Sequence, residues 1–343
     1  MKEKLVAFST EEIKKIILSD FPDFIIEDIH FLAQGWDNFV YRVNNRYIFR
    51  FPKSSYNEHQ LKTEILLLKK LSSQVFMPVP IFQFIGKESS VMFSPADGSK
   101  LKRGIQLLKK IARRGISTDD FGKLRAVLYN KIFVGYEEIH GSALKKNVLS
   151  QLSTEQQDEV ARVITKFLSS LHSFCIDEAR SIGISERHNK EHYELLFNEV
   201  QSSVFPRLRP EHCSVISELF YSYISDSENH AYQPALLHGD LSSNHVLFDK
   251  ATDKTTGIID FGEACIGDPD YDLTHLAWDY GEDFLKVMLK YYPAKDPNRL
   301  LKKLKFFQCF HRLDIMCYGV RTKDQELFNK GWILLRKTLT ELN

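Results

Sequence analysis

The sequence lacks the features that mark disulfide-built, secreted or membrane-spanning chains. Its five cysteines in 343 residues are odd in number and contain no C-x-x-C pair, so neither a disulfide framework nor a zinc site is expected. No apolar run approaches the roughly 18 residues of a membrane span. The opening residues, MKEKLVAFSTEE, become polar too early for a signal peptide. We expect reduced cysteines, no membrane partner and a cytoplasmic location.

An excess of one charge sign is also missing. The chain has 46 Lys and Arg against 45 Asp and Glu, a formal charge of +1. No global field would gather nucleic acid, so we expect no nucleic-acid partner and look for a local binding site. The hydrophobic content of 43% is enough for a full core, in one large domain or two moderate ones.

The N-terminal part shows β-type runs around one helix. Ser9 and Glu12 form a capping box ahead of a short amphipathic helix that ends near 20–22. The turn pair Asn44-Asn45 suits positive φ and joins two strands as a hairpin. The expected strands cover 24–33, 38–43, 46–51, 81–86 and 131–139, with a helix at 58–71.

After Gly141 the periodicity becomes mostly helical, with one exception. The expected helices cover 153–174, 189–202, 211–225, 281–291, 298–319 and 325–341. The exception is 235–264, where short apolar runs alternate with polar loops, as in hairpin strands that flank a site. The sequence therefore predicts an α+β fold with a five-stranded antiparallel sheet and a helix, followed by a mainly helical part.

Two tripeptides in the exceptional stretch carry the chemistry. The run 238–240 reads His-Gly-Asp, and 260–262, twenty residues after its Asp, reads Asp-Phe-Gly. Each tripeptide is expected only about 0.04 times by chance in a chain of this length. In phosphoryl transfer, one Asp in this arrangement orients the acceptor hydroxyl and the other binds magnesium. We assign Asp240 as the catalytic base and Asp260 as a Mg²⁺ ligand.

The segments HGDLSSNHVLFD and TGIIDFGEACIGDPDYDL resemble the aminoglycoside phosphotransferase family, relatives of the protein kinases. The likeness covers most of the chain. IFRFPK, FVGYEEIHG and His245 look like the branch that modifies the 2'' hydroxyl of gentamicin-type drugs. The resemblance implies a protein-kinase-like two-lobe fold. Residues 1–139 would form a nucleotide-binding lobe, and 140–343 a helical lobe with the catalytic loop, metal site and acceptor site.

Carried over residue by residue, the resemblance also assigns the catalytic loop. His245 takes the place of the usual second metal ligand, an Asn, with a packed loop histidine as the alternative reading. Asn244 would substitute if the register of the loop slips. His238 and Asp272 are implied as structural supports that orient the loop.

The family's nucleotide-binding residues can also be carried over to this sequence, but some positions differ from the family pattern. Gly35 and Asn38 lie in a loop that would cover the phosphates, although a full G-x-G-x-x-G is missing. Arg50 stands where the family usually has a Lys paired with a helix Glu, here Glu64. Lys53 is the fallback, and an exposed edge-strand charge is the alternative for both cations. The residues implied to contact the base are Tyr136, Glu137 and Ile139.

Four acidic residues after the metal motif are expected to bind the acceptor, and we expect them to recognise a cationic molecule. They are Asp268, Asp270, Asp279 and Glu282. The alternatives are that Asp270 caps a helix and that Glu282 favours a helix start. Trp278 stands where the resembled branch tends to have another acid.

A basic segment interrupts two strands of the first part. Residues 94–130 carry nine Lys or Arg against three Asp, and hairpin loops are usually far shorter. We interpret the segment as a solvent-exposed helical insertion; the alternative is a lid or a surface that binds a partner.

The function expected is a monomeric small-molecule kinase that uses Mg²⁺ and transfers the γ-phosphoryl group of ATP or GTP to a hydroxyl of a cationic acceptor, an aminoglycoside. The alternatives are a housekeeping kinase of another small hydroxylated amine, sugar or amino acid, and a pseudokinase that binds nucleotide without transfer. A protein kinase is disfavoured because no A-P-E segment follows the DFG motif.

Overall fold

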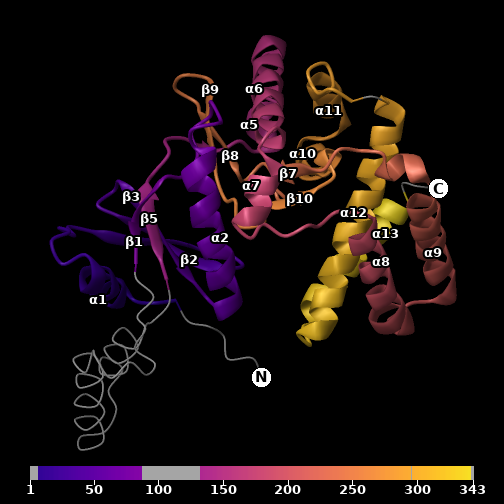
Figure 1. The fold of residues 1–343 in the computed structure, drawn as a ribbon, viewed down its shortest axis with the longest axis horizontal. Helices are drawn as coiled ribbons and strands as arrows, with labels where there is room; N and C mark the ends of the chain where they lie inside the picture. The colour runs from indigo at the N-terminus through magenta and orange to yellow at the C-terminus, as the bar shows by residue number, and fades with distance from the viewer. Residues whose placement is uncertain (1–6, 87–131, 295, 341–343) are drawn as a thin grey trace, which may run out of the picture. The chain divides into compact units, whose positions relative to one another are not determined.

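A computed structural model describes residues 7–86, 132–294 and 296–340 (Figure 1). The chain divides into two compact units. Unit 1 comprises 1–72 and 79–139, and unit 2 comprises 73–78 and 140–343. The basic segment 94–130 lies outside the described residues.

The described part of unit 1 is a five-stranded antiparallel sheet with two helices, which confirms the expectation for this region. The strand order is β1-β2-β3-β5-β4. The elements are α1 (Thr10–Asp20), β1 (Ile29–Gln34), β2 (Asn38–Val43), β3 (Tyr47–Pro52), α2 (Ser55–Leu71), β4 (Phe82–Ile85) and β5 (Val134–Glu137).

The hairpin between β2 and β3 turns through two asparagines, as expected. Asn44 and Asn45 have φ of 55° and 47°, the left-handed conformation that a two-residue hairpin loop of this type requires. The prediction of a strand over 24–33 is wrong in its first half, since β1 begins only at Ile29. The Asn44 side-chain amide donates to the carbonyl of Ile25 at 2.7 Å and accepts from the amide of Glu27 at 2.8 Å. The turn therefore holds the preceding chain in an irregular path.

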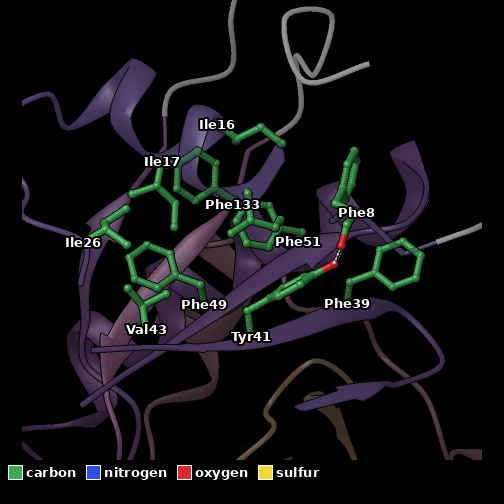
Figure 2. Packing of buried hydrophobic residues seen from close by; sticks show 11 residues of the cluster. Phe8, Ile16, Ile17, Ile26, Phe39, Tyr41, Val43, Phe49, Phe51 and Phe133 are labelled. Carbon is green, nitrogen blue, oxygen red and sulfur yellow. Dashed lines mark hydrogen bonds between the residues drawn. The ribbon is translucent and has the colours of Figure 1, made fainter. Parts of the chain in front are cut away.

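Aromatic side chains fill the core of unit 1 (Figure 2). The Tyr41 hydroxyl donates to the carbonyl of Phe8 at 2.6 Å, which satisfies a buried polar group and fastens the chain ahead of α1 to the sheet. Helix α1 begins with the expected capping box, in which the Ser9 amide donates to the Glu12 carboxylate at 2.7 Å. Its apolar face adds to the cluster through Ile13, Ile16 and Ile17.

Unit 2 is mainly helical, as expected, with two small antiparallel sheets, β10-β7 and β6-β8-β9. Its strands are β6 (Ser142–Ala143), β7 (Ala235–Leu237), β8 (Val246–Asp249), β9 (Lys254–Ile258) and β10 (Cys265–Gly267). Its α-helices are α5 (Lys146–Leu149), α6 (Thr154–His172), α7 (Ile176–Ser181), α8 (Lys190–Glu199), α9 (Pro210–Ser225), α10 (Leu273–Tyr280), α11 (Glu282–Met288), α12 (Pro297–Arg321) and α13 (Gln325–Thr340). A π-helical segment, η1 (Val200–Val204), and the 3₁₀ helices η2 (Phe205–Arg207), η3 (Ser227–His230) and η4 (Pro269–Asp272) complete it.

The long helices begin where the sequence provides caps. Ser153 and Gln156 form a capping box at α6, and Asp296 accepts from two amides at the start of α12, with Pro297 as its first residue. Helices α5, α7 and α10 were not predicted, because short helices carry too few turns to show a periodicity. Within the described ranges, no helix combines the length and the apolar content that crossing a membrane requires.

Candidate active site

The hairpin of β8 and β9 brings the two motifs together. Val246 pairs with Ile258 in this antiparallel ladder, so the residue before β8 and the residues after β9 are neighbours. The amide of Ile259 donates to the carbonyl of His245 at 3.0 Å. Asp260 has a φ of 69°, a left-handed conformation that Asp tolerates better than most residues. His245 Nε2 consequently lies 3.6 Å from Asp260 Oδ2.

The other contact of His245 shows which ring nitrogen donates. Its Nδ1 lies 2.6 Å from the main-chain carbonyl oxygen of Asp240. A carbonyl oxygen only accepts, so Nδ1 carries a proton, and Nε2 is the nitrogen whose lone pair can bind a cation beside Asp260. A lone pair and a carboxylate facing each other at 3.6 Å suit a cation between them.

This pair fits a magnesium ion. Mg²⁺ in phosphoryl-transfer sites is usually bound through one or two side chains, with phosphate oxygens and water completing the shell. No group of three metal-ligating side chains is found in the described part of the chain. Asp260 and His245 would therefore hold the ion as two ligands and leave its remaining positions to substrate and water.

Asp240 lies beside this pair and remains accessible. Its Oδ2 is 3.8 Å from His245 Nδ1 and its Oδ1 is 3.7 Å from His275 Nε2. Withdrawal from water raises the pKa of Asp240 to about 7; the charge of Asp260 also raises it, whereas His245 opposes the shift. The side chain still exposes 40% of its surface, so an acceptor hydroxyl can reach it. A carboxyl group with this pKa can take up a proton near neutral pH.

Asp272 holds the catalytic loop by its backbone. Its carboxylate accepts from the amide of His238 at 3.0 Å and from that of Gly239 at 2.9 Å, and it lies 3.0 Å from His172 Nε2. Gly239 has a φ of 79°, and a Cβ there would lie 2.1 Å from the carbonyl oxygen of Glu263. Only glycine fits this position, which explains the middle residue of the His-Gly-Asp motif.

His238 is wholly buried within the loop. Its Nε2 lies 3.1 Å from the carbonyl of Ile259, to which it donates, and its Nδ1 accepts from the amide of Asp240 at 3.3 Å. Burial lowers the pKa of His238 to about 4, so the ring is neutral at pH 7. Both nitrogens are engaged by the backbone, as a support residue requires.

Two of the four acids expected to meet an acceptor are occupied inside the protein. Asp268 is fully buried, with its Oδ2 2.8 Å from Lys303 Nζ. Asp270 also binds Lys303 and accepts from the Tyr292 hydroxyl at 3.1 Å. Asp268, and not Asp270, caps the following 3₁₀ helix. The expectation that Asp268 and Asp270 line an acceptor site is therefore corrected: Lys303 is their partner.

The other two acids lie near the start and end of helices that follow the metal motif. Asp279, on α10, accepts from the amide of Ser243 in the catalytic loop at 2.8 Å. Glu282 is exposed at the first position of α11, where a negative charge favours the helix start. The structure thus brings Asp279 to the catalytic loop and leaves Glu282 on the surface.

Among the residues expected to bind the nucleotide, Arg50 and Glu64 form a buried ion pair. Arg50 Nη1 lies 2.7 Å from Glu64 Oε1, and the two residues are 7% and 2% exposed. Strand β3 lies between β2 and β5, so Arg50 is not the edge-strand charge considered as the alternative. Lys53 Nζ donates to the carbonyl of Gly35, and the amide of Gly35 donates to the carbonyl of Asn38 at 3.0 Å. The turn is closed between Gly35 and Asn38, and the Lys53 side chain is hydrogen-bonded to it.

The three residues expected at the base lie on β5 and just beyond it. Tyr136 is buried against Phe82, with ring centroids 5.7 Å apart. Glu137 is exposed and pairs with Arg46 at 3.1 Å. Ile139 is half-buried. Tyr136 pairs with Ile48 of β3 and with Phe82 of β4, so its backbone belongs to the sheet. Ile139 lies beyond the end of β5.

Sequence reasoning missed several partners of the site. His172 is 100 residues from Asp272, and Lys303 is 35 residues from Asp268. No local pattern signals such contacts. Asn244, considered as a substitute metal ligand, instead accepts from Lys145.

The fold and the site define a class of phosphotransferase. The model described as the phosphotransferase enzyme family matches residues 28–301. The chain belongs to this family.

Two solved structures are similar over nearly the whole chain. The GDP and kanamycin complex of the enzyme APH(2'')-IIIa is 29% identical, with a TM-score of 0.80, and the match covers 96% of this chain and 98% of that one. The GDP complex of wild-type aminoglycoside 2'-phosphotransferase-IIIa is 28% identical, with a TM-score of 0.82 and coverage of 98% and 100%. The expected kinase-like α+β fold is thereby confirmed.

Matches to two other proteins are shorter. Viomycin phosphotransferase of Streptomyces vinaceus is 27% identical over 195 residues, 56% of this chain and 66% of its own length. The protein YcbJ of Bacillus subtilis is 24% identical over 178 residues, 50% of this chain and 56% of its own. The chain spans less than two thirds of the length of these two relatives.

Proposed function

We propose that the protein is a magnesium-dependent kinase of small molecules, which transfers the γ-phosphoryl group of GTP or ATP to a hydroxyl of an aminoglycoside. The observation that carries the proposal is the convergence of Asp240, His245 and Asp260, with separations of 3.6 and 3.8 Å. Phosphoryl transfer asks a protein mainly to position groups and to neutralise charge, and these residues supply both.

In unit 2, Asp240 orients the acceptor hydroxyl and takes its proton as the bond to phosphorus forms. Asp272 and His238 keep the loop in place, so the carboxylate needs no rearrangement. Asp260 and His245 are the residues that would hold magnesium, which when bound neutralises phosphate charge.

In unit 1, the nucleotide would be bound by the turn at Gly35 and Asn38 and by the buried pair of Arg50 and Glu64. Arg50 has guanidinium donors that suit phosphate oxygens bidentately, and Lys53 is a second cation for the same role. The backbone around Tyr136, Glu137 and Ile139 would contact the base. Residues 1–139 are thus proposed as the nucleotide-binding lobe and 140–343 as the catalytic and acceptor lobe, in a protein that acts as a monomer.

The donor and acceptor are proposed from the similar enzymes and the remaining acids. Both structures that cover nearly the whole chain at 28–29% identity hold GDP, and one also holds kanamycin. Asp279 and Glu282 are the two predicted acids not bound to Lys303. We expect KM for kanamycin to rise with ionic strength, because salt screens attraction between these acids and a polycation.

The test is a transfer assay with aminoglycosides and with small cellular amino alcohols and sugars, each with GTP and with ATP. In the same assay Asp240→Asn should lower kcat at least about a hundredfold, because the base is lost, while nucleotide still binds. Asp260→Asn should abolish or severely weaken magnesium-dependent nucleotide binding. Asp283→Asn, at an exposed acid of α11, is the matched control and should keep wild-type turnover. Wild-type kcat in Asp240→Asn would remove the assignment of the base.

A further inference from the structure

A loop segment between α7 and α8 pairs with the strand that follows the Asp-Phe-Gly turn (260–262). The amide of Arg187 donates to the carbonyl of Ile266 at 2.8 Å, and the amide of Ile266 donates to the carbonyl of Ser185 at 2.9 Å. Ile266, on β10, also pairs with Leu236 of β7, the strand that leads into the His-Gly-Asp motif. Backbone pairing therefore places Arg187 beside the chain that leaves the metal motif.

The side chain of Arg187 binds two groups of one residue, Glu263. Its Nη1 donates to the Glu263 carboxylate at 2.6 Å, and its Nη2 donates to the main-chain carbonyl oxygen of the same residue. A guanidinium can make both bonds at once because its donors form a rigid planar fork, and its charge strengthens each bond. The carbonyl that Arg187 binds is the one that packs against Gly239 of the catalytic loop. The backbone at Glu263 is therefore held from two sides.

The Asp-Phe-Gly turn is fixed at both of its ends. Before it, the amide of Ile259 donates to the carbonyl of His245 at 3.0 Å. After it, Glu263 is held by Arg187. Asp260, between these two anchors, has a φ of 69°, a conformation that costs free energy and persists only where the surrounding structure imposes it. Release of one anchor would let Asp260 relax toward negative φ and move its carboxylate away from His245.

The segment that carries Arg187 is fixed independently of Glu263. The next residue, His188, is buried, and its ring stacks on that of Tyr271 with centroids 3.4 Å apart and an angle of 15° between the planes. The amide of His188 donates to His192 Nδ1 at 3.0 Å. The guanidinium thus extends from a part of the chain that has its own contacts, so it can act as a support for the metal motif.

From these contacts we infer that Arg187 is a positioning residue of the magnesium site, which fixes the metal ligand Asp260 through the backbone of Glu263. In this role Arg187 touches neither the ion nor a substrate, and it sets how tightly the ion is bound. The inference rests on the proposed function, because it requires a metal at Asp260 and His245. An ion pair with a structural role alone, between side chains that are 27% and 38% exposed, would affect stability and leave metal affinity unchanged.

The test measures binding of Mn²⁺, as a substitute for Mg²⁺, to the protein with GDP, from the electron paramagnetic resonance signal of the free ion. Arg187→Met removes both donors and should weaken Mn²⁺ binding about tenfold, as loss of a residue that orients a metal ligand does. Arg187→Lys keeps the charge but not the planar fork, so the loss should be smaller, about threefold. Arg180→Met, at the neighbouring exposed arginine that pairs with Glu186, is the matched control and should bind Mn²⁺ as the wild type does.

The transfer assay gives a second readout. In Arg187→Met the Mg²⁺ concentration that gives half the maximal rate should rise about tenfold, whereas kcat at saturating Mg²⁺ and KM for kanamycin should stay within about threefold of wild type.

The outcomes separate this inference from the proposed function. If the wild type binds Mn²⁺ and Arg187→Met binds it equally well, the inference is refuted and the proposed function stands. If Arg187→Met does not fold, wild-type Mn²⁺ affinity in Arg187→Lys refutes the inference in its place. A wild type that binds Mn²⁺ but phosphorylates no aminoglycoside refutes the proposed acceptor alone. If the wild type with GDP binds no Mn²⁺, both are refuted.

Discussion

The two units hold their functional polar groups by different means. In unit 1 the central contact joins two side chains, Arg50 on β3 and Glu64 on α2. In unit 2 the carboxylates of Asp272 and Asp279 bind main-chain amides of the catalytic loop. Changes in unit 2 should therefore move the loop backbone and reduce stability and turnover together. Changes in unit 1 should act mainly on nucleotide affinity.

Lowering the pH should give the largest difference in stability between the two units. Burial lowers the pKa of His192 and His311 to about 4, whereas both would titrate near 6.5 in the unfolded chain. The unfolded state then binds more protons below pH 6.5, so the stability of unit 2 is full above that pH and falls as the pH drops toward 4. Each of these histidines, and His238 with the same lowered pKa, should cost about 2 kcal/mol at pH 5. Asp240 and Asp268 act in the opposite sense, because a pKa raised to about 7 lets the folded state bind their protons at pH 5, and each offsets about 2 kcal/mol. The loss from the three histidines exceeds this gain.

The measurement is urea unfolding at pH 7 and at pH 5, read by pulsed hydrogen exchange, which follows peptides of each unit separately. The histidines of unit 1, His30 and His59, are exposed, so the unfolding midpoint of that unit should change little. Equal changes of the urea midpoint in both units would contradict the expected difference between them.

Asp272→Ala should give the next largest effect. It removes the acceptor of two buried amides and of His172, which should cost about 3 kcal/mol of unfolding free energy, and kcat should fall about a hundredfold as Asp240 loses its orientation. Thermal unfolding and the transfer assay check both values. Asp177→Ala, at an exposed acid of α7, should change stability by less than about 0.5 kcal/mol. A stable Asp272→Ala enzyme with normal kcat would show that the amide contacts are dispensable.

Arg50→Lys tests the side-chain pair of unit 1. The positive charge remains, but the guanidinium geometry toward Glu64 is lost. We expect a loss of about 1–2 kcal/mol in stability and a rise of up to about tenfold in KM for the nucleotide, with kcat within about threefold. Arg46→Lys, at the exposed pair with Glu137, should leave all three values close to wild type. A fall in kcat with an unchanged KM would assign Arg50 to the transfer step instead.

The smallest effect is expected at the hairpin turn of unit 1. Asn45→Ala keeps a Cβ at a φ of 47° but removes the side-chain amide that makes this left-handed conformation tolerable, which should cost about 1 kcal/mol. Asn45→Gly should stay within about 0.5 kcal/mol of wild type. Chemical denaturation of the two variants and the wild type checks the ranking. If alanine is tolerated as well as glycine, the turn is not held by its φ preference.

Features encoded within a few residues could be predicted from the sequence. The capping box at Ser9, the Asn44-Asn45 turn and the strand over 38–43 depend on neighbouring residues, and the structure shows all three. The kinase-like fold came from the resemblance, because the order of strands around a sheet has no local signature.

The partners of charged groups could not be predicted in the same way. Asp268 has the sequence context of a surface acid after a metal motif, but it is buried because Lys303, from α12, reaches it. His275 shows nothing in its local sequence that indicates Asp240. Such pairs form only when distant elements pack, since a buried charge requires a partner wherever the chain supplies one.

The glycine of the catalytic motif has a consequence for how the protein can be controlled. The backbone at Gly239 packs directly on Glu263, one residue beyond the Asp-Phe-Gly turn. The Arg187 guanidinium donates to the main-chain carbonyl and to the carboxylate of Glu263. Phe261 is buried against the ring of His238. An inactive conformation in which the Asp-Phe-Gly turn (260–262) moves away from the catalytic loop would have to break all of these contacts at once. We expect an enzyme without such a switch, ready whenever its substrates are present and limited by their supply.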